Sequence, residues 1–214
     1  MGAVGLIYVG AVLFLNGVML LGWVESRSAA PLNLFVGVLQ VITPTYLIFM
    51  ADGDLPTILA ASGIYLFGFT YLYVGINLLA GLDGTGLGYF SLFVAVCALI
   101  YSGLNFFVGA DPGFGVIWLY WSFLWLLFFL LLGLKMDGLG RYTGAVTAIQ
   151  GWVTGVIPAF LLLTNRWAQL TMVAAVVLAV FGIIVFGILY IRMRPGAAAP
   201  AHGANEPAVD ASPA

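Results

Sequence analysis

The chain has 214 residues, of which 64% are hydrophobic and only 7% are charged. A soluble domain carries about 25% charged residues, so this composition excludes a soluble enzyme and a disordered protein. The six basic residues are scattered, which excludes a nucleic-acid-binding protein, and the single cysteine excludes a disulfide framework. The sequence therefore predicts an all-α integral membrane protein.

Seven apolar segments are each long enough to cross a hydrocarbon core of ~30 Å. Cuts at charges, prolines and glycine-rich breaks place them at about 3–23, 32–50, 57–81, 89–109, 115–134, 143–164 and 168–191. The Ala- and Pro-rich tail, 195–214, has too few apolar side chains to bury and is expected to be disordered.

The basic residues predict the orientation of the chain. With seven spans and an outside N-terminus, only Arg166 falls on the outside. The other five fall on the inside, and these are Arg27, Lys135, Arg141, Arg192 and Arg194. The charge asymmetry thus predicts an outside N-terminus and an inside C-terminus.

Two pairs of segments hint at an internal repeat. The sequences of 33–42 and 91–100 agree at five of ten positions, and Tyr-Val-Gly occurs at both 8–10 and 73–75. A repeated helical hairpin is one interpretation, and chance similarity among apolar helices is the other. Within the sixth span, Gly151 and Gly155 are spaced to allow close helix contact, and Pro158 predicts a kink.

None of the seven spans contains Asp, Glu, Lys, Arg or His in its interior. Such groups mark proton relays and ion sites, so their absence argues against a coupled transporter. The only histidine, His202, lies in the tail, and no nucleophile–base pair or metal-ligand spacing is present. We therefore expect no catalytic residues, no metal and no cofactor.

The polarity that remains in the spans is uncharged. Buried amides and hydroxyls must find partners within the protein, either to join helices or to line a path for a neutral solute. Trp118, Trp121 and Trp125 share one helical face of the fifth span, since they recur at i, i+3 and i+7. This stripe is compatible with a packed core or with an aromatic slot for a flat, neutral molecule.

Several motifs in order resemble one family. Tyr-Val-Gly at 8–10 precedes Phe-Gly-Phe-Thr-Tyr-Leu-Tyr at 67–73, Ile-Asn at 76–77 and Gly-Leu-Asp at 81–83. The tryptophan stripe and Ile-Pro-Ala at 157–159 follow. Together, over about residues 1–164, these motifs resemble the AmiS/UreI family of bacterial urea and short-chain amide channels.

The resemblance implies a ring of six protomers in the bacterial inner membrane, in contact with lipid. Each protomer would hold its own pore within six transmembrane helices built from three hairpins. This implies a channel domain at 1–164, an additional transmembrane helix at 165–194 and a cytoplasmic tail at 195–214. The resemblance places the solute pathway at Leu6, Val9, Leu13, Asn16, Phe67, Tyr71, Trp118, Trp121, Leu124, Trp125 and Gln150.

Two departures from the family's gated urea channel bear on function. The loop between the second and third spans, Ala51–Pro56, is short and lacks histidine, which argues against acid gating by that side chain. Gln150 stands where the gated urea channel carries a pore-lining glutamate, so a hydrogen-bonding group is kept without its charge.

These observations predict a passive, pH-independent channel for urea or small aliphatic amides. In this hypothesis Trp121 and Trp125 stack on the planar amide, while Tyr71 and Gln150 supply hydrogen bonds. The alternative is a non-transporting membrane scaffold or accessory subunit whose Trp and amide groups only pack helices. The choice between urea and amides, and the role of the segment 168–191, stay open at this point.

Overall fold

The computed structural model describes residues 2–193, and the 195–214 tail, which we expected to be disordered, lies outside them. Seven stretches in this range are apolar and long enough to cross a membrane, and no strand occurs among them. The predicted all-α membrane fold is therefore confirmed. The helices are α1 (Gly2–Leu20), α2 (Ser26–Met50), α3 (Leu55–Ala80), α4 (Thr85–Phe107), α5 (Pro112–Phe128), α6 (Gly140–Gln150), α7 (Ile157–Leu163) and α8 (Trp167–Met193).

Three short segments complete two of the spans. A π-helix, η1 (Phe129–Gly133), extends α5, and a 3₁₀ turn, η2 (Asp137–Leu139), precedes α6. A second π-helix, η3 (Gly151–Val156), joins α6 to α7, so that η2, α6, η3 and α7 form one continuous span. Pro158, the residue at which we predict a kink, lies in the first turn of α7, directly after this π-helix, and its backbone lacks an N–H donor.

The predicted bounds miss the starts of several helices. The second helix begins at Ser26, six residues before the predicted start, because the Glu25 carboxylate caps it by accepting the N–H groups of Arg27 and Ser28 at 3.0 and 2.9 Å. Pro31 lies inside this helix. Hydropathy marks the apolar part of a helix, whereas the helix itself continues to its cap.

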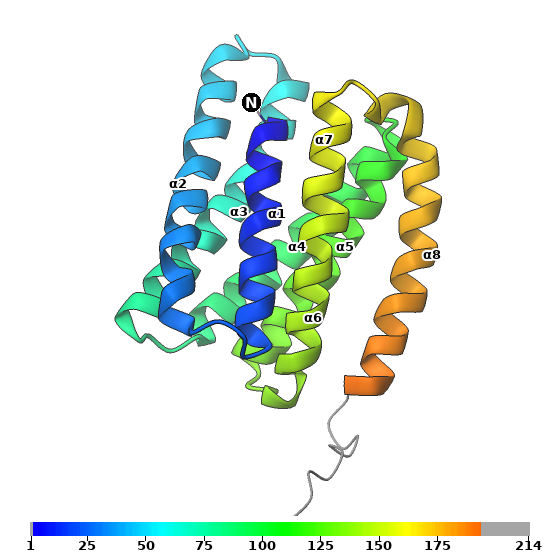
Figure 1. The fold of residues 1–214 in the computed structure, drawn as a ribbon. Coiled ribbons are helices and arrows are strands. Elements are labelled where there is room, and N and C mark those ends of the chain that lie inside the picture. Colours follow the sequence, from blue (N-terminus) through cyan, green and yellow to red (C-terminus); the bar gives the residue numbers. More distant parts are fainter. Residues whose placement is uncertain (1, 194–214) are drawn as a thin grey trace, which may run out of the picture.

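The helices close into a bundle through three similar contacts (Figure 1). The helix α3 packs on α2, and α5 packs on α4. The helix α1 packs on the span formed by α6, η3 and α7. The last contact is close enough to need glycine, since a Cβ added at Gly151 would lie 2.5 Å from the Gly10 carbonyl oxygen. The expected close approach at Gly151 and Gly155 is therefore confirmed, and its partner is Gly10 in α1.

The last helix stands at the edge of the bundle, beside α5 and α7 (Figure 1). Its first turns are held by Asp111, which accepts the Trp167 indole N–H at 2.8 Å and the Thr171 hydroxyl. Thr171 in turn accepts the Gly113 backbone N–H at 2.9 Å. Over 18 consecutive residues of α8 the mean hydropathy reaches 3.0, and most side chains of the helix are outward-facing, as expected for a helix in contact with lipid.

Candidate solute pathway

Two cavities lie end to end inside the bundle. We call the one beside the N-terminus of α1 the first cavity, and its volume is about 330 Å³. It is lined mainly by α1, α3 and α5, with contributions from α2, α4 and α7. Its walls include Leu6, Val9, Gln40, Gly63, Phe67, Tyr101, Asn105, Phe114, Trp118, Trp121 and Leu162.

The second cavity lies toward the C-terminal end of α1 and has a volume of about 310 Å³. The same three helices supply most of its wall, and leucines are the commonest lining residue. The polar residues along it come from the five helices α1 to α5, and these are Asn16, Ser26, Thr70, Tyr71, Asn77, Ser91, Trp121 and Trp125.

Phe67 and Trp121 line both cavities, so they form the junction between them. The Phe67 ring meets the rings of Trp121 and Trp125 edge-on, with centroids 4.7 and 4.8 Å apart. Phe67 is only 5% exposed and Trp121 only 3%. The junction is therefore a closely packed aromatic constriction, which a solute must pass to cross from one cavity to the other.

Trp118 belongs to the wall of the first cavity and to the packed core at once. Its indole stacks on the Tyr101 ring at 4.5 Å and meets Trp121 edge-on at 4.8 Å. The Tyr101 hydroxyl shares a hydrogen bond of 2.6 Å with Ser62. The tryptophan stripe thus combines the two interpretations that the sequence left open, because the rings that line the cavities also pack against one another.

The π-helix η3 holds the constriction in place. The Trp121 indole N–H donates to the Thr154 hydroxyl at 3.0 Å, and that hydroxyl donates to the Gln150 carbonyl oxygen at 2.7 Å. The polar atom of Trp121 is therefore occupied by the protein. Within residues 2–193 the indole of Trp125 makes no such bond, so its N–H has no partner in the protein.

Ten of the eleven pathway residues expected from the family resemblance line one or both cavities. The exception is Gln150, which is fully buried, lines neither cavity, and has no hydrogen-bond partner for its side-chain amide within residues 2–193. Seven lining residues of α3 were missed. Ala60, Gly63 and Ile64 precede Phe67 at helical spacing, and Thr70, Val74, Asn77 and Leu78 follow it. That spacing was present in the sequence and could have identified them.

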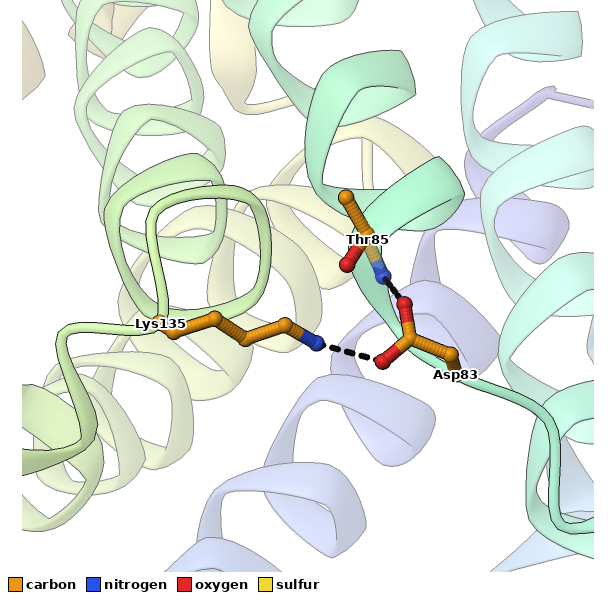
Figure 2. Close-up of polar contacts among 3 residues, drawn as sticks. All are labelled: Asp83, Thr85 and Lys135. Carbon is orange, nitrogen blue, oxygen red and sulfur yellow. Dashed lines mark hydrogen bonds and ion pairs between the residues drawn. The ribbon is translucent and has the colours of Figure 1, made fainter.

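No charged residue lines either cavity in the described part of the chain. The nearest ion pair lies outside the wall of the second cavity, where Lys135 donates to Asp83 at 2.6 Å (Figure 2). The same carboxylate accepts the Thr85 N–H at 2.8 Å. These hydrogen bonds, that of Lys135 foremost, hold the pKa of the Asp83 carboxyl well below its usual range.

The sequence matches the model of the AmiS/UreI family of transporters over residues 1–166. This chain belongs to the AmiS/UreI family. The solved urea channel of Helicobacter pylori in its closed state is similar to it, with a TM-score of 0.72 and 34% identity over 78% of this chain and 100% of that one. This similarity confirms the all-helical membrane fold of the chain.

Two other relatives are more similar to this chain in sequence than the urea channel is. The transporter protein AmiS2 of Rhodococcus erythropolis is 54% identical, over 94% of this chain and 97% of its own. A transporter of amidate substrates from Mycolicibacterium smegmatis is 56% identical, over 85% of each chain. The acid-activated urea channel of Helicobacter pylori is 34% identical, over 76% of this chain and 97% of its own.

The seventh span of this AmiS/UreI transporter lies outside the family model. The match ends at residue 166, and α8 begins at Trp167. The match to the Rhodococcus protein covers 94% of the chain and therefore reaches into α8. The helix is also tied to the first cavity, because Trp167 meets the ring of the lining residue Phe114 at 4.9 Å.

Proposed function

We propose that this protein is a passive channel for urea or short-chain aliphatic amides. The observation that carries the proposal is the uncharged pair of cavities joined at the Phe67–Trp121 constriction. A pathway without charges offers no site for a coupling ion and no relay for a proton, so a neutral solute would move down its gradient. The names of the relatives supply the class of solute, since they are transporters of amidate substrates and urea channels.

We further propose that the protein is not an enzyme and that six copies form a ring in the bacterial inner membrane, as its family resemblance implies. In this arrangement residues 1–164 form the channel and 165–194 an appended helix. Among residues 2–193, four basic residues lie at the end of the bundle where α1 ends, and only Arg166 lies at the other end. This distribution supports an inside C-terminus. The four are Arg27, Lys135, Arg141 and Arg192.

The channel is proposed to be insensitive to acid between pH 7 and pH 5. The connection between α2 and α3 contains no histidine. The carboxyl of Asp54 caps α3, and hydrogen bonds from the Thr57 hydroxyl and backbone N–H lower its pKa. Because the pKa values of Asp54 and Asp83 are both depressed, both groups stay ionised in this range, and their contacts are lost only below about pH 4.

The test is solute flux into proteoliposomes at pH 7 and pH 5. We expect urea and acetamide to equilibrate much faster than in empty vesicles, at rates that agree within about twofold between the two pH values. Stopped-flow light scattering measures both rates. Flux no faster than in empty vesicles would favour the alternative function, a membrane scaffold, whereas a tenfold activation by acid would contradict pH-independence alone.

A second expected result concerns Trp125. Replacing Trp125→Phe keeps an aromatic ring beside Phe67 but removes the free indole N–H from the wall of the second cavity. We expect amide flux to fall about fivefold, which corresponds to the ~1 kcal/mol of one net hydrogen bond. The measurement is the initial rate of acetamide entry at a concentration well below saturation.

The matched control is Trp152→Phe, because Trp152 is half exposed on the outer surface and lines neither cavity. Trp167 is unsuitable as a control, since it contacts Phe114 in the wall of the first cavity. Equal losses in the Trp125 and Trp152 variants would indicate that the tryptophans only pack helices.

A further inference from the structure

Four of the eight polar residues along the second cavity already have hydrogen-bond partners in the protein, and these are Asn16, Thr70, Ser91 and Trp121. The hydroxyls of Thr70 and Ser91 donate to backbone carbonyl oxygens one turn earlier in their own helices, at 2.7 and 2.8 Å. Asn16 and Asn33 form a reciprocal amide pair, in which each NH₂ group donates to the other's oxygen at 2.9 and 2.7 Å. These residues therefore have little remaining capacity to hold a solute.

Asn77 differs from its neighbours. It lines the second cavity and is only 8% exposed, yet both its amide oxygen and its amide nitrogen lack a hydrogen-bond partner within residues 2–193. Two turns earlier on the same helix, the Tyr71 hydroxyl is also buried without a partner. A buried amide that is left unpaired destabilises a protein, so a retained one in a cavity wall points to a ligand that pairs with it.

We propose that Asn77 is the residue that recognises the carboxamide head of the solute in the second cavity. A side-chain carboxamide has one acceptor and an NH₂ donor, and a primary amide solute presents the complementary pair. The pair of Asn16 and Asn33 shows this reciprocal geometry between two carboxamides inside the same bundle. This inference rests on the proposed function, because it names the site at which that solute is held.

The wall around Asn77 favours an aliphatic amide over urea. Leucines dominate the lining, and Leu78, Leu82 and Leu132 are among them. When the head of an aliphatic amide pairs with Asn77, its alkyl chain lies against this apolar wall and leaves water. Urea carries a second NH₂ group in place of the alkyl chain, and against leucines that group would lose its hydrogen bonds to water without replacement.

The test compares Asn77→Leu with the unchanged protein in proteoliposomes, using propionamide and urea as probes. In the unchanged protein we expect half-saturation of flux at a concentration about tenfold lower for propionamide than for urea. In the variant we expect the value for propionamide to rise about tenfold, and we expect the preference over urea to shrink. Asn77→Ala, which is equally compatible with a helix, serves as the second variant should the leucine variant fail to insert.

The matched control is Thr143→Val. The Thr143 hydroxyl, like the Asn77 amide, is buried without a partner in the described residues, but Thr143 lines neither cavity. It should leave both half-saturation values unchanged. If the unchanged protein carries neither solute, the proposed function itself fails. If it carries both, but neither Asn77 variant alters the half-saturation of propionamide, the role of Asn77 is overturned and the proposed function stands.

Discussion

Replacing Gly151→Leu is expected to abolish the folded channel. A Cβ at this position would lie 2.5 Å from the Gly10 carbonyl oxygen and 2.9 Å from the Phe14 backbone nitrogen. Both obstacles are backbone atoms of α1, so no side-chain rotation relieves the clash. Because α1 packs on this span to close the bundle, the two must separate, and membrane helices associate chiefly through such close packing.

We expect the yield of monodisperse protein in detergent to fall at least about tenfold, with a matching loss of amide flux per milligram of membrane. Size-exclusion chromatography and vesicle flux measure the two effects. Gly103→Leu is the control, because a Cβ at Gly103 in α4 would meet no atom within 4 Å. Normal yield of the Gly151 variant would mean that α1 and η3 do not close the bundle as the structure has them.

Replacing Phe67→Ala is expected to remove the size limit of the pathway. The Phe67 side chain lines both cavities and contacts the rings of Trp118, Trp121 and Trp125, with centroids 6.0, 4.7 and 4.8 Å away. Without it the two cavities would merge into one wider passage. Amides too bulky for the constriction should then cross, so the ratio of butyramide to acetamide permeability should rise about tenfold.

Phe69→Ala is the control for this change. Phe69 lies on the same helix, two residues further on, but it is half exposed and lines neither cavity. Its replacement should leave the permeability ratio unchanged. A Phe67 variant that keeps the ratio of the unchanged protein would show that the narrowest point of the pathway lies elsewhere, although loss of the buried ring should still lower its thermal stability.

The seven membrane spans were predictable because transfer into lipid acts on each segment by itself. An 18-residue window of α8, for example, reaches a mean hydropathy of 3.0 without reference to any neighbour. The predicted bounds were wrong at the helix starts, as at Ser26, where a cap outside the apolar run extends the helix. The face shared by Trp118, Trp121 and Trp125 was also readable, since helical periodicity is a local property.

The hydrogen-bond partners of the polar side chains could not be predicted from local sequence patterns. The Trp121 indole N–H donates to the Thr154 hydroxyl, 33 residues away. This contact depends on a π-helix that no pattern in the sequence predicted. Asn16 and Asn77 are the same residue type, yet one is satisfied by Asn33 and the other is left free at the cavity wall. Only the packing of distant helices decides which amide is occupied.

Local composition and periodicity therefore established that the chain crosses a membrane, how its charges are distributed and which faces are aromatic. The three-dimensional packing alone decided that two cavities meet at Phe67 and Trp121, that Gln150 stays outside both, and that α8 is tied to α5 through Asp111. The physical reason is that partition into lipid is a sum over single residues, whereas a pathway and its hydrogen bonds are properties of residues brought together from separate helices.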